Sequence, residues 1–378
     1  MSTNESLRLP DPATASAVDL TAAMVDIYSV SDHETHLADE VERHLRAMGH
    51  LTVVREGDAI LARTNAGRAQ RVIIAGHLDT VPVANNIPHR REVIDGDDAI
   101  WGRGSVDMKS GCAVQLALAA ELTDPAIDVT WVFYDHEEVD TDRSGLKRLL
   151  DMHPDLTRDA DFGILTEPTS AAIEGGCNGT LRIRVDVTGR AAHSARHWMG
   201  HNAIHAAAAI LQRLADYEPR TVTVDGLDYR ESLSIVKIEG GIANNVIPDH
   251  CRIWINYRYA PDSDAAAALD RLRALLDGAG GTITFEDAAD GARPGLTEPL
   301  AASFVRAAQR YAGASVGPKY GWTDVARLAA AGIPAVNFGP GDPALAHTDE
   351  ENCPISHIEA CHAALRAWLR QDGAHGTS

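Results

Sequence analysis

The chain has 378 residues, 45% of them hydrophobic and 23% charged, with a formal net charge of −20 at pH 7. A chain of this length exceeds one ordinary compact core, so we expect two domains. The negative charge repels nucleic acid and anionic lipid, which excludes both as expected partners.

The first part of the chain alternates between helical and strand-like patterns. An amphipathic helical pattern covers residues 18–45. The strands that we expect next are 51–55, 59–63, 71–75, 129–134 and 162–166, with helices at 110–122 and 144–150. Such alternation predicts an α/β sandwich around a largely parallel sheet.

From Gly179 the pattern changes to that of strands with one wet face, since Leu181, Ile183, Val185 and Val187 alternate with polar residues. The expected elements that follow are a helix at 202–217, strands at 233–239 and 251–259, a helix at 262–276 capped by Asp262, and a strand at 282–286. This β-α-β-β-α-β order is typical of a ferredoxin-like α+β domain.

Residues 180–289 are therefore predicted to be an inserted domain, with 1–179 and 290–378 forming the α/β domain. After residue 293 we expect helices at 299–311 and 324–331 and a strand at 335–338.

No apolar stretch approaches the roughly 20 residues that cross a bilayer, and residues 1–12 lack the pattern of an export signal. The five cysteines are widely spaced, with no Cys-x-x-Cys, which argues against disulfides and a thiolate zinc cluster. We therefore predict a cytoplasmic protein with buried free thiols and no membrane partner.

Acidic and imidazole side chains gather where expected strands end. They are His77, Asp79, Asp107, Glu137, Glu138, Glu167 and His347. Singly, each is more often a solvated charge or a satisfied core histidine. Because open α/β sheets bind ligands at the carboxyl ends of their strands, their joint placement predicts a site there.

Imidazole and carboxylate donors without cysteine are typical of catalytic zinc or cobalt sites. Two ions that share one carboxylate need one bridging ligand and two further ligands each, and the number is met by His77, Asp107, Glu138, Glu167 and His347. Asp79, two residues beyond His77, could hold the imidazole Nδ1–H, while Glu137 and Glu138 would point apart, leaving one as a general base.

The motifs that carry these residues resemble those of the M20 family of metal-dependent deacylases and exopeptidases. In chain order they are His-Leu-Asp-Thr-Val-Pro (77–82), Gly-Arg-Gly-Ser-Val-Asp-Met-Lys (102–109), Glu-Glu (137–138), Glu-Pro (167–168) and the late His347. The resemblance covers essentially the whole chain. It implies a zinc-exopeptidase-like α/β/α catalytic domain with an inserted ferredoxin-like domain that serves as lid and dimerisation domain.

The resemblance also implies a role for each metal-site residue. Asp107 would bridge two zinc ions, His77 and Glu167 would complete one site, and Glu138 and His347 the other. Asp79 would orient His77, Glu137 would be the general base, and a cis peptide would follow Asp107.

In the inserted domain, His193 matches a histidine that reaches the partner subunit's site and stabilises an oxyanion. Asn245 and Arg258 match positions that bind the substrate's carboxylate, and Thr323 is a further candidate for that contact. A homodimer and a small N-acyl amino-acid substrate are the implied partners.

Within the family, several stretches are most similar to the branch that hydrolyses N-succinyl-LL-2,6-diaminopimelate to succinate and LL-2,6-diaminopimelate, among them 176–181, 192–203 and 320–327. Two alternatives keep the chemistry: acetylornithine deacetylation and dipeptide hydrolysis. A third, a non-catalytic solute-binding protein on the same fold, is disfavoured because every expected ligand and Glu137 are present.

Overall fold

The computed structural model describes residues 6–371, which fold into two compact units. Unit 1 runs to Gly175 and resumes with Pro294–Gly317 and the chain from Arg327 onward, whereas unit 2 comprises Gly176–Arg293 and Pro318–Ala326. The predicted insert, 180–289, falls wholly within unit 2.

Unit 1 is built on an eight-stranded sheet in the order β1-β2-β6-β3-β7-β16-β8-β15. Its strands are β1 (Thr52–Glu56), β2 (Ala59–Arg63), β3 (Arg71–His77), β6 (Asp128–Tyr134), β7 (Phe162–Leu165), β8 (Ile173–Gly175), β15 (Val316–Pro318) and β16 (Ala335–Asn337). β3 is parallel to β6 and β7, and β16 is parallel to β7. The carboxyl ends of β3, β6, β7 and β16 therefore share one edge, as the sequence predicted.

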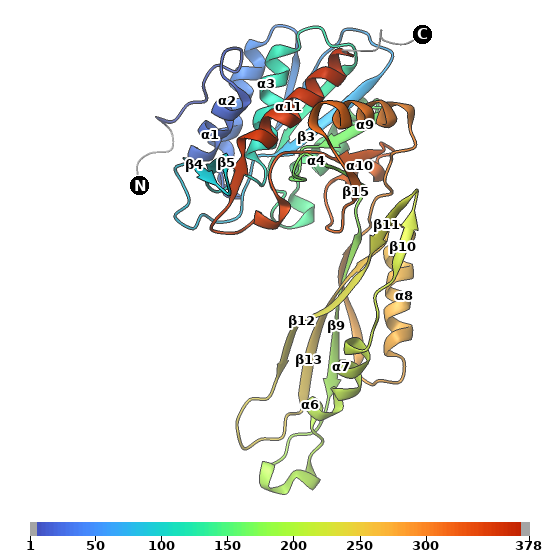
Figure 1. The fold of residues 1–378 in the computed structure, drawn as a ribbon. Helices are drawn as coiled ribbons and strands as arrows, with labels where there is room; N and C mark the ends of the chain where they lie inside the picture. The colour runs from blue at the N-terminus through green and yellow to red at the C-terminus, as the bar shows by residue number, and fades with distance from the viewer. Residues whose placement is uncertain (1–5, 372–378) are drawn as a thin grey trace. The chain divides into compact units, whose positions relative to one another are not determined.

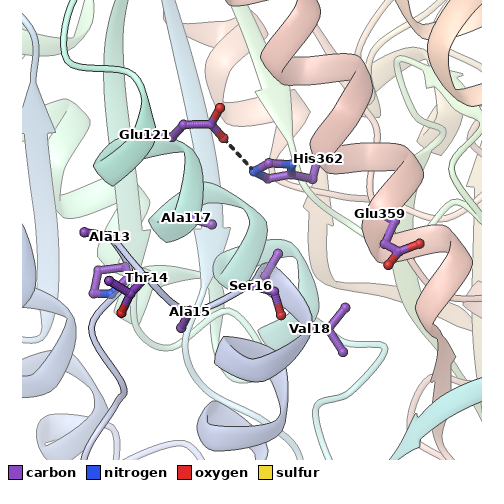
Figure 2. Close-up of a pocket in the computed structure, with 11 residues that line it drawn as sticks. Ala13, Thr14, Ala15, Ser16, Val18, Ala117, Glu121, Glu359 and His362 are labelled. Atoms are coloured by element: carbon purple, nitrogen blue, oxygen red, sulfur yellow. Dashed lines mark ion pairs between the residues drawn. The ribbon is translucent and has the colours of Figure 1, made fainter.

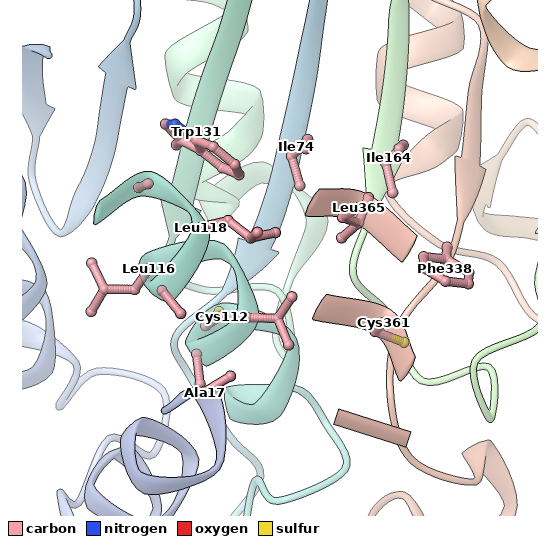
Figure 3. Close-up of a cluster of buried hydrophobic side chains, with 14 of the residues drawn as sticks. Ala17, Ile74, Cys112, Leu116, Leu118, Trp131, Ile164, Phe338, Cys361 and Leu365 are labelled. Atoms are coloured by element: carbon pink, nitrogen blue, oxygen red, sulfur yellow. The ribbon is translucent and has the colours of Figure 1, made fainter. Parts of the chain in front are cut away.

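The main core lies between this sheet and the helices that cover one of its faces, whose ribbons are drawn in Figure 1. The helices that contribute to it are α1 (Ala17–Asp26), α2 (Thr35–Ala47), α3 (Lys109–Glu121), α9 (Pro299–Ala312) and α11 (Ile355–Arg370). Figure 3 shows Ile74, Trp131 and Ile164 of the sheet beside Leu118 of α3 and Leu365 of α11. α3 is buried along almost its whole length because it is enclosed by the sheet, α1 and α11.

The opposite face is covered by the shorter helices α4 (Gly145–Met152) and α10 (Val325–Ala330), with α5 (Pro154–Thr157) beside α4. Leu328 of α10 packs closely against Gly163: a Cβ added to Gly163 would lie 2.7 Å from Leu328 Cδ1. Both faces being covered explains why β3, β6 and β7 are continuous buried strands.

The single helix predicted at 18–45 is wrong. α1 ends at Asp26, Ile27 is extended, and Asp32 has a left-handed φ of 76°, so the chain turns before α2 begins. The helical period continued through the turn because both helices bury an apolar face in one core.

A second, three-stranded sheet in unit 1 was not predicted. It has the order β17-β5-β4 and consists of β4 (Arg90–Ile94), β5 (Asp97–Trp101) and β17 (Asn352–Pro354). β4 is polar and largely exposed, so its sequence lacks the apolar alternation that identifies a strand.

Unit 2 contains a four-stranded antiparallel sheet in the order β12-β13-β9-β14. Its strands are β9 (Gly179–Thr188), β12 (Ser232–Gly240), β13 (His250–Tyr259) and β14 (Thr282–Ala289), with helices α6 (Ala203–Ala206), α7 (Ala208–Ala215) and α8 (Ala265–Leu276). This is the predicted ferredoxin-like arrangement. A hairpin of β10 (Thr221–Val224) and β11 (Leu227–Arg230) is an unpredicted addition.

Two local predictions in unit 2 are wrong. The helix expected at 202–217 is interrupted at Ala207, which separates α6 from α7. The cap of α8 is Asp264, whose side chain accepts the Ala267 N–H, whereas Asp262 lies 3.4 Å from Arg220.

All five cysteines are buried and free, as predicted. Within residues 6–371, no helix combines the length and apolar character that a bilayer crossing requires.

Candidate metal centre

His77 is the last residue of β3 and is fully buried. Its Nε2 lies 3.1 Å from Asp107 Oδ1, and its Nδ1 lies 3.0 Å from the main-chain oxygen of Asp79. When the ring is neutral, as a metal ligand must be, and Nδ1 donates to that oxygen, Nε2 presents a lone pair on the side of Asp107.

Asp107 lies between two imidazoles. It occupies the loop between β5 and α3, and its peptide bond to Met108 is cis, as the resemblance implied. While Oδ1 faces His77, Oδ2 lies 3.3 Å from His347 Nε2. The two oxygens of one carboxylate thus face two different imidazole nitrogens, an arrangement that suits a bridging carboxylate.

Glu138 and His347 close the other side of the cluster. Glu138 follows β6, and its Oε1 lies 3.1 Å from His347 Nε2. His347 has a left-handed φ of 64°, and 52% of its side chain is exposed, in contrast to His77. Within the described part of the chain, donor atoms of His77, Asp107 and Glu138 all lie within 4.8 Å of one another.

Glu167 follows β7, the strand that pairs with the strand ending in His77. Glu167 is buried. Burial of the Cys112 thiol raises the pKa of that thiol, and the charge of Glu167 raises it further. Four of the five predicted ligands therefore lie in one cluster, and metal ligation by any of the five stays a prediction.

Asp79 holds more than the imidazole. Its Oδ1 is 3.5 Å from His77 Nδ1, but it accepts the Glu137 N–H at 3.0 Å, and Oδ2 accepts the Glu138 N–H at 3.1 Å. Ser31 donates its hydroxyl to Oδ2 at 2.8 Å. This buried carboxylate thus fixes the Glu137-Glu138 segment relative to His77. Ser31 was missed, since a serine in a turn between helices carries no metal-site signal.

Proximity of these groups shifts their pKa values. Burial opposes a charge on His77, but contacts with Asp107 and Asp79 outweigh it and raise its pKa well above the usual value. Hydrogen bonds to Asp107 and Glu138 raise the pKa of His347 to about 10. Burial would raise the pKa of Asp107, yet the two histidines hold it well below its usual range.

Without ions, protons on the imidazoles therefore neutralise the surrounding carboxylates. A divalent cation can replace those protons, because the donors are the oxygen and nitrogen types that zinc and cobalt accept. The residues fit a metal centre.

The predicted residues of unit 2 fall into two groups. Ser194 N donates to Asn245 O at 2.9 Å, so His193 and Asn245, both exposed, lie in adjacent segments. Arg258 pairs with Thr180 at the start of β9, whereas the two segments lie at its far end, beyond Thr188. The eight residue steps from Thr180 to Thr188 span about 27 Å. Thr323 is buried, and its main-chain oxygen accepts from Cys177 Sγ at 3.8 Å.

A separate surface pocket of about 430 Å³ in unit 1 contains none of the predicted ligands. It is lined by residues 12–18 and by side chains of α3 and α11, and Figure 2 shows Glu121 in it, paired with His362 at 3.3 Å. Glu121 also pairs with Arg370 at 2.9 Å, so its charge is compensated within the protein.

Residues 73–371 match the model of peptidase family M20/M25/M40. A protein of Mycobacterium tuberculosis named putative succinyl-diaminopimelate desuccinylase DapE is 53% identical over 93% of this chain and 97% of its own length. Succinyl-diaminopimelate desuccinylase of Corynebacterium glutamicum is 44% identical, over 93% and 95%. The crystal structure of a tripeptidase of Staphylococcus aureus shares the fold, with a TM-score of 0.77, 21% identity, and coverage of 94% of this chain and 97% of that one.

Proposed function

The chain belongs to peptidase family M20/M25/M40, and we propose that it hydrolyses N-succinyl-LL-2,6-diaminopimelate to succinate and LL-2,6-diaminopimelate. The names and the high coverage of the two bacterial relatives support this substrate. Such an enzyme would serve the synthesis of lysine and cell-wall precursors.

One observation carries the chemistry: Asp107 presents one oxygen to His77 and the other to His347. We propose that Asp107 bridges two divalent ions, zinc or cobalt, with His77 and Glu167 on one and Glu138 and His347 on the other. When bound, such a pair polarises a carbonyl and lowers the pKa of water toward about 7.

The proton transfer is assigned to Glu137. Its main chain is held by Asp79 beside Glu138, so one glutamate can bind metal while the next faces the substrate. Glu137 would take a proton from the attacking water and deliver it to the leaving amine nitrogen, whose bond to the succinyl carbon breaks.

His193 would donate a hydrogen bond to the developing oxyanion. Its Nδ1 accepts the Ala195 N–H at 3.1 Å, so the neutral ring carries its proton on Nε2 and can donate from there. Because His193 and Arg258 are at opposite ends of β9, we propose that the two act on one substrate only when His193 comes from a second copy of the chain.

Arg258, Asn245 and Thr323 are the proposed contacts to substrate carboxylates. Burial, and then the neighbouring Arg182, lower the pKa of the Arg258 guanidinium. A half-buried cation beside another cation is stabilised by an incoming carboxylate, so Arg258 suits an acidic acyl group.

The surface of unit 2 supports a homodimer. β12 is an edge strand that exposes 61% of Val236 and 49% of Ile238, and Ile242 beyond it is 75% exposed. An unpaired strand edge with apolar side chains is suited to pairing with its own copy about a two-fold axis.

We also propose a cytoplasmic location, since five buried thiols without a disulfide suit a reducing compartment.

The function is tested by measuring the release of succinate from N-succinyl-LL-2,6-diaminopimelate, of acetate from N-acetylornithine, and of amino acid from dipeptides, with and without added zinc. We expect metal-dependent release of succinate at a kcat/KM at least about 100-fold above the other two. A higher value for either competitor would reassign the substrate, and equal rates in the presence of a strong chelator would contradict the metal centre.

A further inference from the structure

Close to the candidate metal centre, unit 1 contains a buried ion pair that the mechanism above does not use. Arg103 Nη1 lies 2.8 Å from Glu351 Oε2, and the two side chains are only 3% and 1% exposed. Arg103 precedes Asp107 by four residues, and Glu351 follows His347 by four residues. The pair therefore joins the loops of two proposed ligands.

Both loops adjoin the same pair of hydrogen-bonded strands. Strands β5 and β17 are antiparallel, with Trp101 opposite Asn352, and the pairing continues as the Gly102 N–H donates to Glu351 O at 2.9 Å. Glu351 is thus the residue just before β17, opposite Gly102, and Arg103 is the second residue after β5. Their positions are fixed by strand register.

The Glu351 carboxylate holds the loop of Asp107 directly. Its Oε1 accepts the N–H of Val106 at 2.9 Å and that of Asp107 at 3.0 Å, while Oε2 accepts from Arg103. The main chain of the proposed bridging residue is therefore bonded to this carboxylate.

The Arg103 guanidinium holds the other two segments. Nη1 also donates to Thr348 O at 3.1 Å, one residue past His347, and Nε donates to Pro82 O at 3.2 Å, three residues past Asp79. One guanidinium thus connects the segments that carry His77 and His347 with the carboxylate that holds Asp107.

We propose that Arg103 and Glu351 are positioning residues, which fix Asp107 and His347 at the separation that two cations require. This inference rests on the proposed metal centre. A purely stabilising role is a weaker explanation, because the cost of desolvating two buried charges commonly equals or exceeds their attraction. Outer contacts of this kind orient metal ligands and tune affinity.

The test compares wild type with Glu351→Gln, Arg103→Met and the double variant R103L/E351M. Glu351→Gln turns an amide NH2 group or an uncharged oxygen toward Arg103. The double variant removes both charges together, a replacement that commonly leaves stability unchanged or raises it. Glu40→Gln is the matched control, since buried Glu40 accepts the Leu9 N–H at 3.0 Å and pairs with Arg43 at 2.7 Å. None of the predicted ligands is among these partners of Glu40.

The readouts are Co²⁺ titration of the metal-free full-length chain, followed by the visible absorption of the bound ion, and the melting temperature of the metal-free chain. We expect all three Arg103 and Glu351 variants to bind the second equivalent of Co²⁺ about 10- to 100-fold more weakly, with an altered spectrum. Glu40→Gln should lower the melting temperature yet bind both equivalents as the wild type does.

Wild-type affinity and spectrum in the folded double variant would overturn the positioning role while leaving the metal centre intact. The same loss in Glu40→Gln would also overturn it, because the effect would then be one of general stability. Failure of the wild type itself to bind two equivalents would overturn the inference together with the proposed metal centre.

Discussion

The two units differ in how their proposed functional residues are held. In unit 1, His77, Asp107, Glu138 and His347 contact one another, and Asp79 fixes the segments between them. In unit 2, His193 and Asn245 are exposed on adjacent loops, and Arg258 lies at the other end of the sheet. Unit 1 is thus organised before any ligand binds, whereas we propose that the residues of unit 2 form a site only together with another molecule.

The largest expected effect comes from removing the carboxylate shared in unit 1. We expect Asp107→Ala to lower the bound metal from about two ions per chain to one or none and to reduce turnover to background, because both ions lose a ligand. Metal analysis of purified protein and succinate release measure this.

Asp124→Ala is its control, since that carboxylate, also in unit 1, is exposed and pairs with Arg68. If Asp107→Ala still binds two ions, Asp107 is not the ligand that the ions share.

The next largest effect concerns the general base. Glu137→Gln should lower kcat by about 10²- to 10⁴-fold and leave the metal content at the wild-type level, since the amide cannot accept the proton. Steady-state kinetics measure the loss of kcat, and metal analysis of the same preparation measures the metal content.

Asp140→Asn, an exposed acidic residue three positions later, should behave as wild type. Unchanged kcat in Glu137→Gln would rule out its assigned role.

For unit 2, the prediction concerns dimerisation through β12, the edge strand of its sheet. The double variant V236K/I238K should raise the dimer dissociation constant by about 10- to 100-fold, because like charges would meet across the paired edges. Sedimentation velocity over a concentration series measures it.

The metal content should not change, since unit 1 is organised by itself. Val93→Lys, at a 70% exposed apolar position in unit 1, is the control. A wild-type chain that stays monomeric at micromolar concentration would contradict the proposed dimer.

The mildest perturbation is a change of pH, which alters metal affinity without changing any residue. The pKa values of His77 and His347, about 10 for the latter, are raised, so both imidazoles are protonated at pH 7 in the metal-free chain. Metal binding must release those protons, so affinity should rise with pH by about tenfold per unit for each proton released.

Competition with a chelator between pH 6 and 8 gives the slope. His347→Asn should flatten it by removing one of the two protons, and a pH-independent affinity in the wild type would contradict the electrostatic description of unit 1.

Sequence reasoning predicted that His77, Asp107, Glu138 and His347 lie together, because much of the signal was local. His77 ends a buried apolar strand, Glu138 and Glu167 each come shortly after one, and parallel strands end at one edge. It failed where periodicity did not report the chain path, as at the turn that separates α1 from α2 and at the polar strand β4.

The sequence by itself determined the donor types, the strand ends on which they lie and the ferredoxin-like order of unit 2, since each is set by neighbouring residues. Only the tertiary structure decided that Asp107 faces His77 with one oxygen and His347 with the other, and that Arg103 meets Glu351 across 248 positions. Such contacts join residues far apart in the chain, and no local pattern encodes their approach.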